Sequence, residues 1–81
     1  MHEKHKQVIT LDGIHRDAYL PFSIYSVDST NNKVSQAQVD AIETLQEGRS
    51  YRYLLSLSEG QDKYQMVISE SDMLGLLHLS V

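Results

Sequence analysis

YRYLLSLSEGQDKYQMVIS, residues 51–69, contains two runs of alternating side chains on either side of a polar turn. The turn is Glu59-Gly60-Gln61-Asp62, a sequence suited to a tight connection between two strands. Pairing Ser58 with Lys63 sets the register of the two runs. That register aligns three pairs that are apolar or aromatic: Leu57 with Tyr64, Leu55 with Met66, and Tyr53 with Ile68. Such pairs are what a half-buried antiparallel sheet requires, so we predict a β-hairpin here.

The residues after the hairpin combine a helix start with an extended pattern. Ser69 and Asp72 resemble a helix cap. Gly75 weakens a helix by roughly 1 kcal/mol, and residues 77–81 alternate as a strand does. We therefore expect a short helical turn over residues 70–74 followed by an extended tail.

The clearest helix signal of the chain precedes the hairpin. Ser35 and Gln38 match the Ser-x-x-Gln capping box. Apolar residues then recur at helical spacing: Val39, Ile42 and Leu45. Gly48 stands where a left-handed C-terminal cap would lie. This pattern predicts a helix from Ser35 to near Glu47.

Two strands are expected before this helix. Residues 7–11 carry β-forming side chains and stop at Asp12-Gly13, a dipeptide typical of tight turns. Residues 18–27 alternate and place three apolar side chains on one face: Leu20, Phe22 and Ile24. Pro21 has no N–H to donate, which favours a sheet edge or a bulge at this point.

The expected order is strand, strand, helix, strand, strand and a short C-terminal element. An antiparallel sheet of about four strands covered by one helix is the α+β two-layer arrangement. The chain has 81 residues, enough for one domain and too few for two. We expect a flexible N-terminus over residues 1–6 and a single domain over residues 7–81.

Composition restricts the classes of function. Seven basic and 11 acidic residues give a net charge of -4, which disfavours nucleic acid and acidic membrane surfaces as partners. The absence of cysteine excludes disulfides, thiolate nucleophiles and cysteine-based zinc sites. No stretch has the pattern of a signal peptide or the length of a membrane span, so we expect a cytoplasmic protein.

Motifs for catalysis or cofactor binding are missing from the sequence. There is no Gly-x-Ser-x-Gly motif and no glycine-rich phosphate loop. The four histidines do not have metal-ligand spacing: His2, His5, His15 and His78. We therefore expect no catalytic residue, cofactor or metal. His15 beside Arg16 and Asp17 leaves one alternative open, a small enzyme subunit whose site is completed across an oligomer.

Three groups of residues favour the binding of another protein. Asp40, Glu43 and Glu47 fall in one narrow sector of the expected helix and would suit a basic partner. A second surface consists of the hairpin tyrosines, which leave nucleic-acid stacking as an alternative: Tyr51, Tyr53 and Tyr64. Leu76 and Leu79 in the apolar tail favour a homodimer. The sequence thus predicts a small non-enzymatic interaction or regulatory module.

Overall fold

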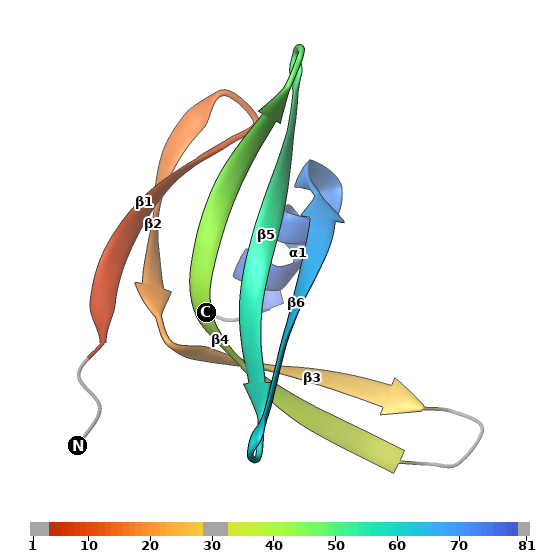
Figure 1. Ribbon diagram of the computed structural model, residues 1–81. Coiled ribbons are helices and arrows are strands. Elements are labelled where there is room, and N and C mark those ends of the chain that lie inside the picture. The colour runs from red at the N-terminus through yellow and green to blue at the C-terminus, as the bar shows by residue number, and fades with distance from the viewer. Residues whose placement is uncertain (1–3, 29–32, 80–81) are drawn as a thin grey trace.

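The computed structural model describes residues 4–28 and 33–79, with side chains placed for residues 4–25 and 35–77. These residues form six strands and one helix (Figure 1): β1 His5–Leu11, β2 Ile14–Leu20, β3 Phe22–Asp28, β4 Lys33–Glu47, β5 Ser50–Glu59, β6 Asp62–Ser69 and α1 Glu70–Leu79. β1 and β2 make a two-stranded antiparallel sheet, and the other four make an antiparallel sheet in the order β3-β4-β5-β6. The fold is therefore a small arrangement of antiparallel sheets with one helix, and the expected ββαββ layout matches it only loosely.

The β5–β6 hairpin has the register that the sequence predicts. Ser58 pairs with Lys63, and the three predicted apolar pairs are all present: Leu57 with Tyr64, Leu55 with Met66, and Tyr53 with Ile68. The turn consists of Gly60 and Gln61, and Gly60 has a φ of 61°. A residue with a Cβ atom disfavours this left-handed backbone conformation, which explains why a glycine occupies this position.

Residues 35–47 belong to strand β4, so the predicted helix from Ser35 to Glu47 is wrong. β4 pairs with β3 over its first half and with β5 over its second half. Its backbone groups therefore have partners in two neighbouring strands, which a local capping pattern cannot reveal. In the strand, Ser35 and Gln38 point to opposite faces and cannot form a capping box.

A β-bulge in β4 explains why the sequence resembles a helix. The register with β5 shifts between Val39 and Ala41, which leaves Asp40 as an additional residue. The buried residues Val39 and Ile42 are therefore three positions apart instead of two, a spacing that is also helical. Leu45, the next residue in the helical series, falls on the opposite face of the strand from Ile42.

The predicted strand over residues 18–27 is divided at Pro21 into β2 and β3. The peptide bond between Leu20 and Pro21 is cis. Leu20 and Phe22 are buried and Ile24 packs against the core, so the predicted inward face is confirmed. These side chains nevertheless come from two different sheets, because the chain changes sheets at the proline.

Helix α1 begins where the sequence predicts a cap. The Asp72 backbone N–H donates to Ser69 Oγ at 3.2 Å, as an N-cap requires. The helix then continues through Gly75 to Leu79, so the predicted extended tail is wrong for residues 75–79. Residues 80–81 lie outside the described part of the chain. The first strand, β1, begins at His5, two residues before the strand expected over residues 7–11. Residues 1–3 also lie outside the described part of the chain.

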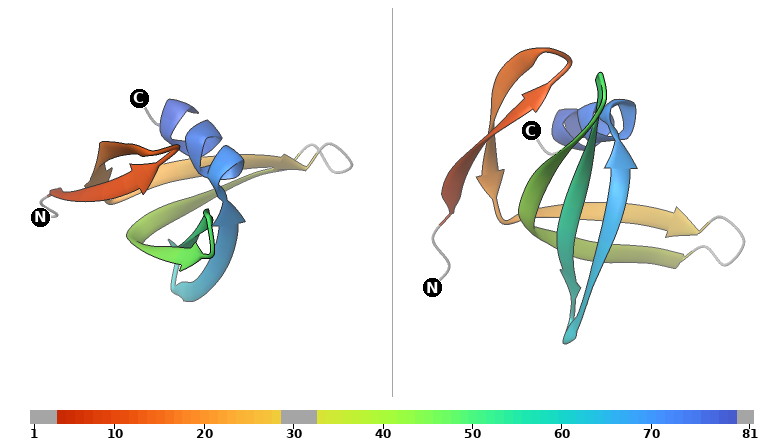
Figure 2. Two further views of the ribbon diagram at one scale, coloured as in Figure 1. Left: turned by 90° about the horizontal axis from the view of Figure 1, so that it is seen from above. Right: turned by 45° about the horizontal axis from the view of Figure 1, so that its top comes forward.

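One hydrophobic core lies between the sheets and α1, which covers the inner face of β5 and β6 (Figure 2). Its buried residues come from β1 to β5 and from α1: Ile9, Leu11, Ala18, Leu20, Phe22, Val39, Ile42, Tyr53, Leu55, Leu57 and Met73. Leu74, Leu76 and Leu77 pack against this core and favour the helical tail. The covering helix is thus the C-terminal one.

Polar contacts help to fix the β1–β2 hairpin against the rest of the molecule. The Asp12 backbone N–H donates to Glu70 Oε2 at 2.9 Å, which connects the β1–β2 turn to the start of α1. The Gln7 side-chain amide donates to the carbonyl of Ile42 on β4. Asp12 and Gly13 form the turn itself, as predicted, with φ values of 55° and 74°.

No helix within residues 4–28 and 33–79 is long and apolar enough to cross a bilayer.

Candidate functional site

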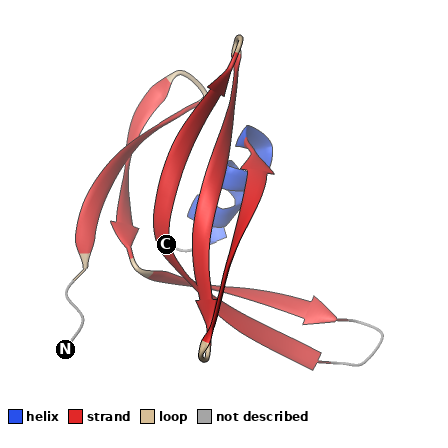
Figure 3. Ribbon diagram, in the orientation of Figure 1, coloured by secondary structure: helices blue, strands red, loops and turns tan. Residues whose placement is uncertain are grey.

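β6 is an edge strand of the four-stranded sheet (Figure 3). It pairs with β5, and no other strand in the described residues pairs with its far edge. The two-residue turn makes Glu59 and Asp62 a hydrogen-bonded pair, and such pairs recur at every second residue of an antiparallel ladder. On β6, the residues that alternate with these hydrogen-bonded positions therefore turn their backbone N–H and C=O groups away from β5: Lys63, Gln65 and Val67. A second strand could pair with these groups.

The side chains of β6 are unusually exposed for an apolar strand. β6 contributes no fully buried residue to the core. The exposed fractions are 42% for Tyr64, 44% for Met66 and 49% for Val67. Edge strands commonly carry charges or proline that prevent pairing with other chains, but residues 64–69 contain neither. Residues 64–69 of β6 are therefore an apolar edge without a protecting charge, and the charged residues of β6 are confined to its start, at Asp62 and Lys63.

The other large exposed apolar side chains in the described residues do not form such an edge. They are Val8, Ile14, Tyr19 and Tyr25. Val8 lies opposite Asp17, and Tyr19 lies opposite Lys6, so a charge accompanies each of them in the β1–β2 sheet. β6 differs from these positions because its exposed apolar side chains are close together and residues 64–69 contain no charge.

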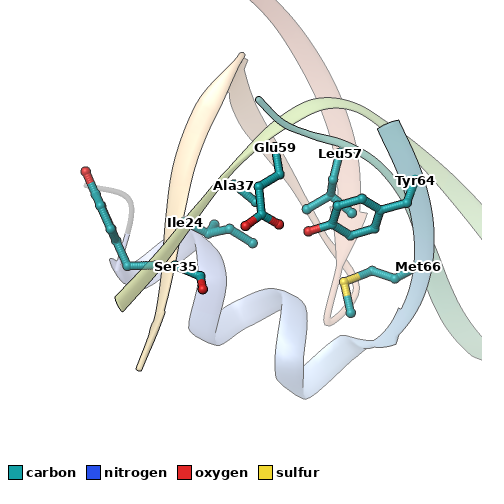
Figure 4. Close-up of a pocket in the computed structure, with 8 residues that line it drawn as sticks. Ile24, Ser35, Ala37, Leu57, Glu59, Tyr64 and Met66 are labelled. Atoms are coloured by element: carbon teal, nitrogen blue, oxygen red, sulfur yellow. The ribbon is translucent and has the colours of Figure 1, made fainter. Parts of the chain in front are cut away.

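A groove of about 230 Å³ adjoins β6 on the inner face of the sheet (Figure 4). It is lined by residues of β3, β4, β5 and β6: Ile24, Tyr25, Ser35, Ala37, Leu57, Glu59, Tyr64 and Met66. Figure 1 shows that β3 and the start of β4 diverge from the β5–β6 hairpin, and the residues that line the groove come from both sides of this divergence. The carboxylate of Glu59 and the hydroxyl of Tyr64 point into an otherwise largely apolar space. Tyr64 and Met66 thus belong both to the edge strand and to the groove wall.

The outer face of the same sheet is polar. Glutamine and serine side chains bond across neighbouring strands: Gln36 Nε2 to Ser23 Oγ at 3.3 Å, and Gln65 Nε2 to Ser56 Oγ at 3.4 Å. Val67 is an exposed apolar residue on this outer face. The apolar surface of β6 therefore extends around the strand edge from the inner face to the outer one.

The three acidic residues expected to form a ridge do not lie on a helix. Asp40 is at the bulge, where its Oδ1 accepts a hydrogen bond from Gln38 Nε2 at 2.7 Å. Glu47 is at the end of β4, with Oε2 3.5 Å from Arg52 Nε in an exposed ion pair. A strand rises about 3.4 Å per residue, so Glu43 and Glu47 are separated by about 14 Å along β4 instead of the roughly 6 Å of one helical turn. The structure does not bring these carboxylates together.

The three hairpin tyrosines share one face, as their spacing predicts, but it is the inner face. Tyr53 is fully buried and its hydroxyl donates to the Thr10 carbonyl. Burial raises the pKa of Tyr53, with smaller contributions from Glu70 and Tyr51. Tyr53 is therefore a core residue, Tyr51 is half-buried, and Tyr64 has the most exposed ring of the three.

The residues expected in an apolar tail lie on α1. Leu76 is half-buried against the core. Leu79 ends the helix, and its side chain is outside the described part of the structure. Sequence reasoning missed Met66 and Val67 as surface residues. Their signal was a strand with apolar side chains on both faces and no charge from Tyr64 to Ser69.

Comparison of the chain with protein-family models, with curated proteins and with solved structures found no match.

Proposed function

We propose that this chain is a small non-enzymatic module that binds another protein by pairing a strand of that partner with the free edge of β6. The observation that supports the proposal is the unpaired, uncharged edge over residues 64–69, with its exposed apolar side chains. In strand addition, main-chain hydrogen bonds supply affinity and side-chain pockets supply specificity. The backbone groups of Gln65 and Val67 and the groove beside Tyr64 and Met66 correspond to these two components.

The groove indicates which side chains a partner strand would present. Its walls are mainly apolar, and Glu59 adds a carboxylate that has no ion-pair partner among the described side chains of residues 4–25 and 35–77. An amphipathic side chain with a basic end group fits such a space better than an acidic one. The groove therefore favours a basic side chain on the partner strand, and this does not require the partner protein to be basic as a whole.

Binding to nucleic acid is the weaker candidate. A stacking platform needs several exposed aromatic rings beside basic groups. Tyr53 is in the core and Tyr51 is half-buried, which leaves Tyr64, at 42% exposure, as the one exposed ring of the three hairpin tyrosines. The net charge of -4 also opposes contact with phosphates.

Gln65→Pro tests the proposal. Proline removes the N–H that faces the free edge but no backbone hydrogen bond to β5, and edge strands tolerate proline at such positions. It also removes the exposed side-chain hydrogen bond from Gln65 Nε2 to Ser56 Oγ on β5. Tagged wild-type chain and variant are used as baits in an extract of the native host, and captured proteins are identified by mass spectrometry. We expect the wild type to enrich a protein that Gln65→Pro does not enrich. A second copy of this chain would count as such a protein.

Val8→Lys is the matched control, because it changes an exposed valine on β1 and should leave capture intact. Equal capture by wild type and Gln65→Pro would contradict the proposal. Reproducible enrichment of RNA or of a small molecule without any protein would also contradict it.

A further inference from the structure

We infer that the partner strand is β6 of a second copy of this chain, running antiparallel, with Met66 of each copy at the two-fold axis. The inference rests on the proposed function, since it assigns an occupant to the same edge. The dimer would join two four-stranded sheets into one continuous antiparallel sheet through β6 and its symmetry mate. The backbone pattern, the inner-face side chains and the charges at the strand ends support this arrangement.

The backbone pattern is compatible with this symmetry. A two-fold axis perpendicular to the sheet makes neighbouring strands antiparallel and keeps each face on its own side. With Met66 opposite itself, Gln65 lies opposite Val67 of the second copy. Both residues turn their N–H and C=O groups toward the free edge, so each such pair exchanges two hydrogen bonds.

The inner-face side chains of β6 are complementary to themselves in this register. Tyr64 lies opposite Ile68 of the second copy, and Met66 lies opposite Met66. From Tyr64 to Ile68, every directly opposed pair on that face is then apolar or aromatic, as are the β5–β6 pairs that involve Tyr64, Met66 and Ile68. Tyr64 and Met66, each more than two-fifths exposed in a single copy, become partly covered.

Neighbouring registers are less favourable. A shift of two residues in one direction places the carboxylate of Asp62 opposite Ile68. The same shift in the other direction places Tyr64 opposite Glu70, the first residue of α1. Odd shifts are excluded, because they would bring the inner face of one copy beside the outer face of the other. Met66 at the axis is therefore the register that the side chains favour.

The charges at the strand ends predict a weak dimer. Lys63 lies opposite Ser69 of the second copy, next to the acidic first turn of α1, which contains Glu70 and Asp72. Asp62 lies opposite Glu70, and this pair of like charges at each end of the interface reduces affinity. A single strand pair also falls at the small end of specific interfaces, below about 1,200 Å² in total. We expect a dissociation constant of roughly micromolar magnitude.

Cysteine substitution tests the register directly, because the chain has no cysteine of its own. In a pair without hydrogen bonds, directly opposed Cα atoms lie about 4.5 Å apart, which is within disulfide range. Under mild oxidation, Met66→Cys should cross-link to itself. Gln65→Cys and Val67→Cys should each remain uncross-linked alone, because each is offset from its own symmetry mate by about 7 Å along the strand.

Mixing the Gln65→Cys and Val67→Cys chains should then produce a disulfide between them. Self-cross-linking of Gln65→Cys or of Val67→Cys, without that of Met66→Cys, would overturn the register. Cross-linking of all three variants to the same extent would indicate random collision and would overturn the ordered dimer.

Sedimentation velocity over about 1 to 500 μM, a range around the expected roughly micromolar affinity, tests the dimer itself. We expect wild type to shift from monomer to dimer, and Val67→Lys to weaken the dimer by at least about tenfold with an unchanged circular dichroism spectrum. Val8→Lys, a matched valine that is 56% exposed on β1, should behave as wild type. A wild-type monomer at every concentration overturns the inference. If the chain stays a monomer but captures a partner that Gln65→Pro does not capture, the proposed function is still supported. If the chain neither dimerises nor captures such a partner, the dimer and the proposed function are both overturned.

Discussion

At the scale of single residues, Tyr53 connects the two sheets. Its ring is fully buried on β5, and its hydroxyl donates to the carbonyl of Thr10 on β1. A buried phenol hydroxyl without a partner would be costly, so this hydrogen bond is what permits a tyrosine in the core. Because burial raises its pKa, the neutral hydroxyl is the form that the folded chain favours.

Tyr53→Phe removes the hydroxyl and leaves the Thr10 carbonyl without this partner. We expect the free energy of unfolding to fall by about 1 kcal/mol, the usual contribution of a buried hydrogen bond. Urea denaturation at neutral pH measures the change. Tyr51→Phe is the control on the same strand, and its effect should stay within about 0.5 kcal/mol. Equal effects of the two substitutions would show that the Tyr53 hydroxyl has no special structural role.

The raised pKa of Tyr53 also predicts a dependence of stability on alkaline pH. The unfolded chain releases the Tyr53 proton near pH 10.0, before the folded chain does. Its stabilising contribution is therefore complete below pH 10.0 and is lost as the pH rises through the folded pKa. Urea denaturation at a series of alkaline pH values should show a smaller loss of stability for Tyr53→Phe than for wild type. Identical slopes would contradict this assignment.

At the scale of elements, two similar serine patterns have different outcomes. Ser35 with Gln38 and Ser69 with Asp72 both resemble a helix cap in the sequence. Only the second caps a helix, because the residues after Ser35 pair with β3 and β5, whereas residues 70–79 have no strand partner among the described residues. The bulge at Asp40 makes the sequence of β4 resemble a helix further, because it gives the buried residues of the strand a helical spacing.

Two alanine substitutions separate these patterns. Ser69→Ala should lower the free energy of unfolding by about 1 kcal/mol, as loss of an N-cap does. Ser35→Ala should change it by less than about 0.5 kcal/mol, since Ser35 lines the groove and caps nothing. Thermal and urea unfolding measure both. A large cost for Ser35→Ala with a small cost for Ser69→Ala would indicate a helix in place of β4.

Two glycines make a second matched pair. A Cβ atom placed on Gly75 in α1 or on Gly60 in the β5–β6 turn meets no atom within 4 Å. Gly75 has no left-handed backbone, so Gly75→Ala should stabilise the helix by about 0.5–1 kcal/mol. Gly60 has a φ of 61°, so Gly60→Ala should destabilise the hairpin by about 1 kcal/mol. If urea unfolding showed that both substitutions raise, or both lower, the free energy of unfolding, the backbone conformations assigned to the two glycines would be contradicted.

At the scale of the whole molecule, locally determined features were predictable from the sequence. The β5–β6 register, the Asp12-Gly13 turn and the start of α1 depend on residues that are close in sequence. The strand character of β4 and the division at Pro21 depend on pairing with distant segments, so local propensity could not reveal them.

The candidate site was predictable only in part, for the same reason. Tyr64 was identified from the spacing of the hairpin tyrosines. Met66 and Val67 were missed as surface residues, because a strand with apolar side chains on both faces is usually internal. Whether β6 is an internal or an edge strand follows from the order of the whole sheet and from the position of α1.

Amide hydrogen exchange along β6 tests the central claim, that the free edge of this strand binds another strand. In dilute protein, the amides of Tyr64, Met66 and Ile68 should exchange slowly because they bond to β5, and those of Gln65 and Val67 should exchange fast. Raising the protein concentration, or adding a captured partner, should slow Gln65 and Val67 selectively. Exchange at Gln65 and Val67 that is already slow in dilute protein, or fast under every condition, would contradict the account.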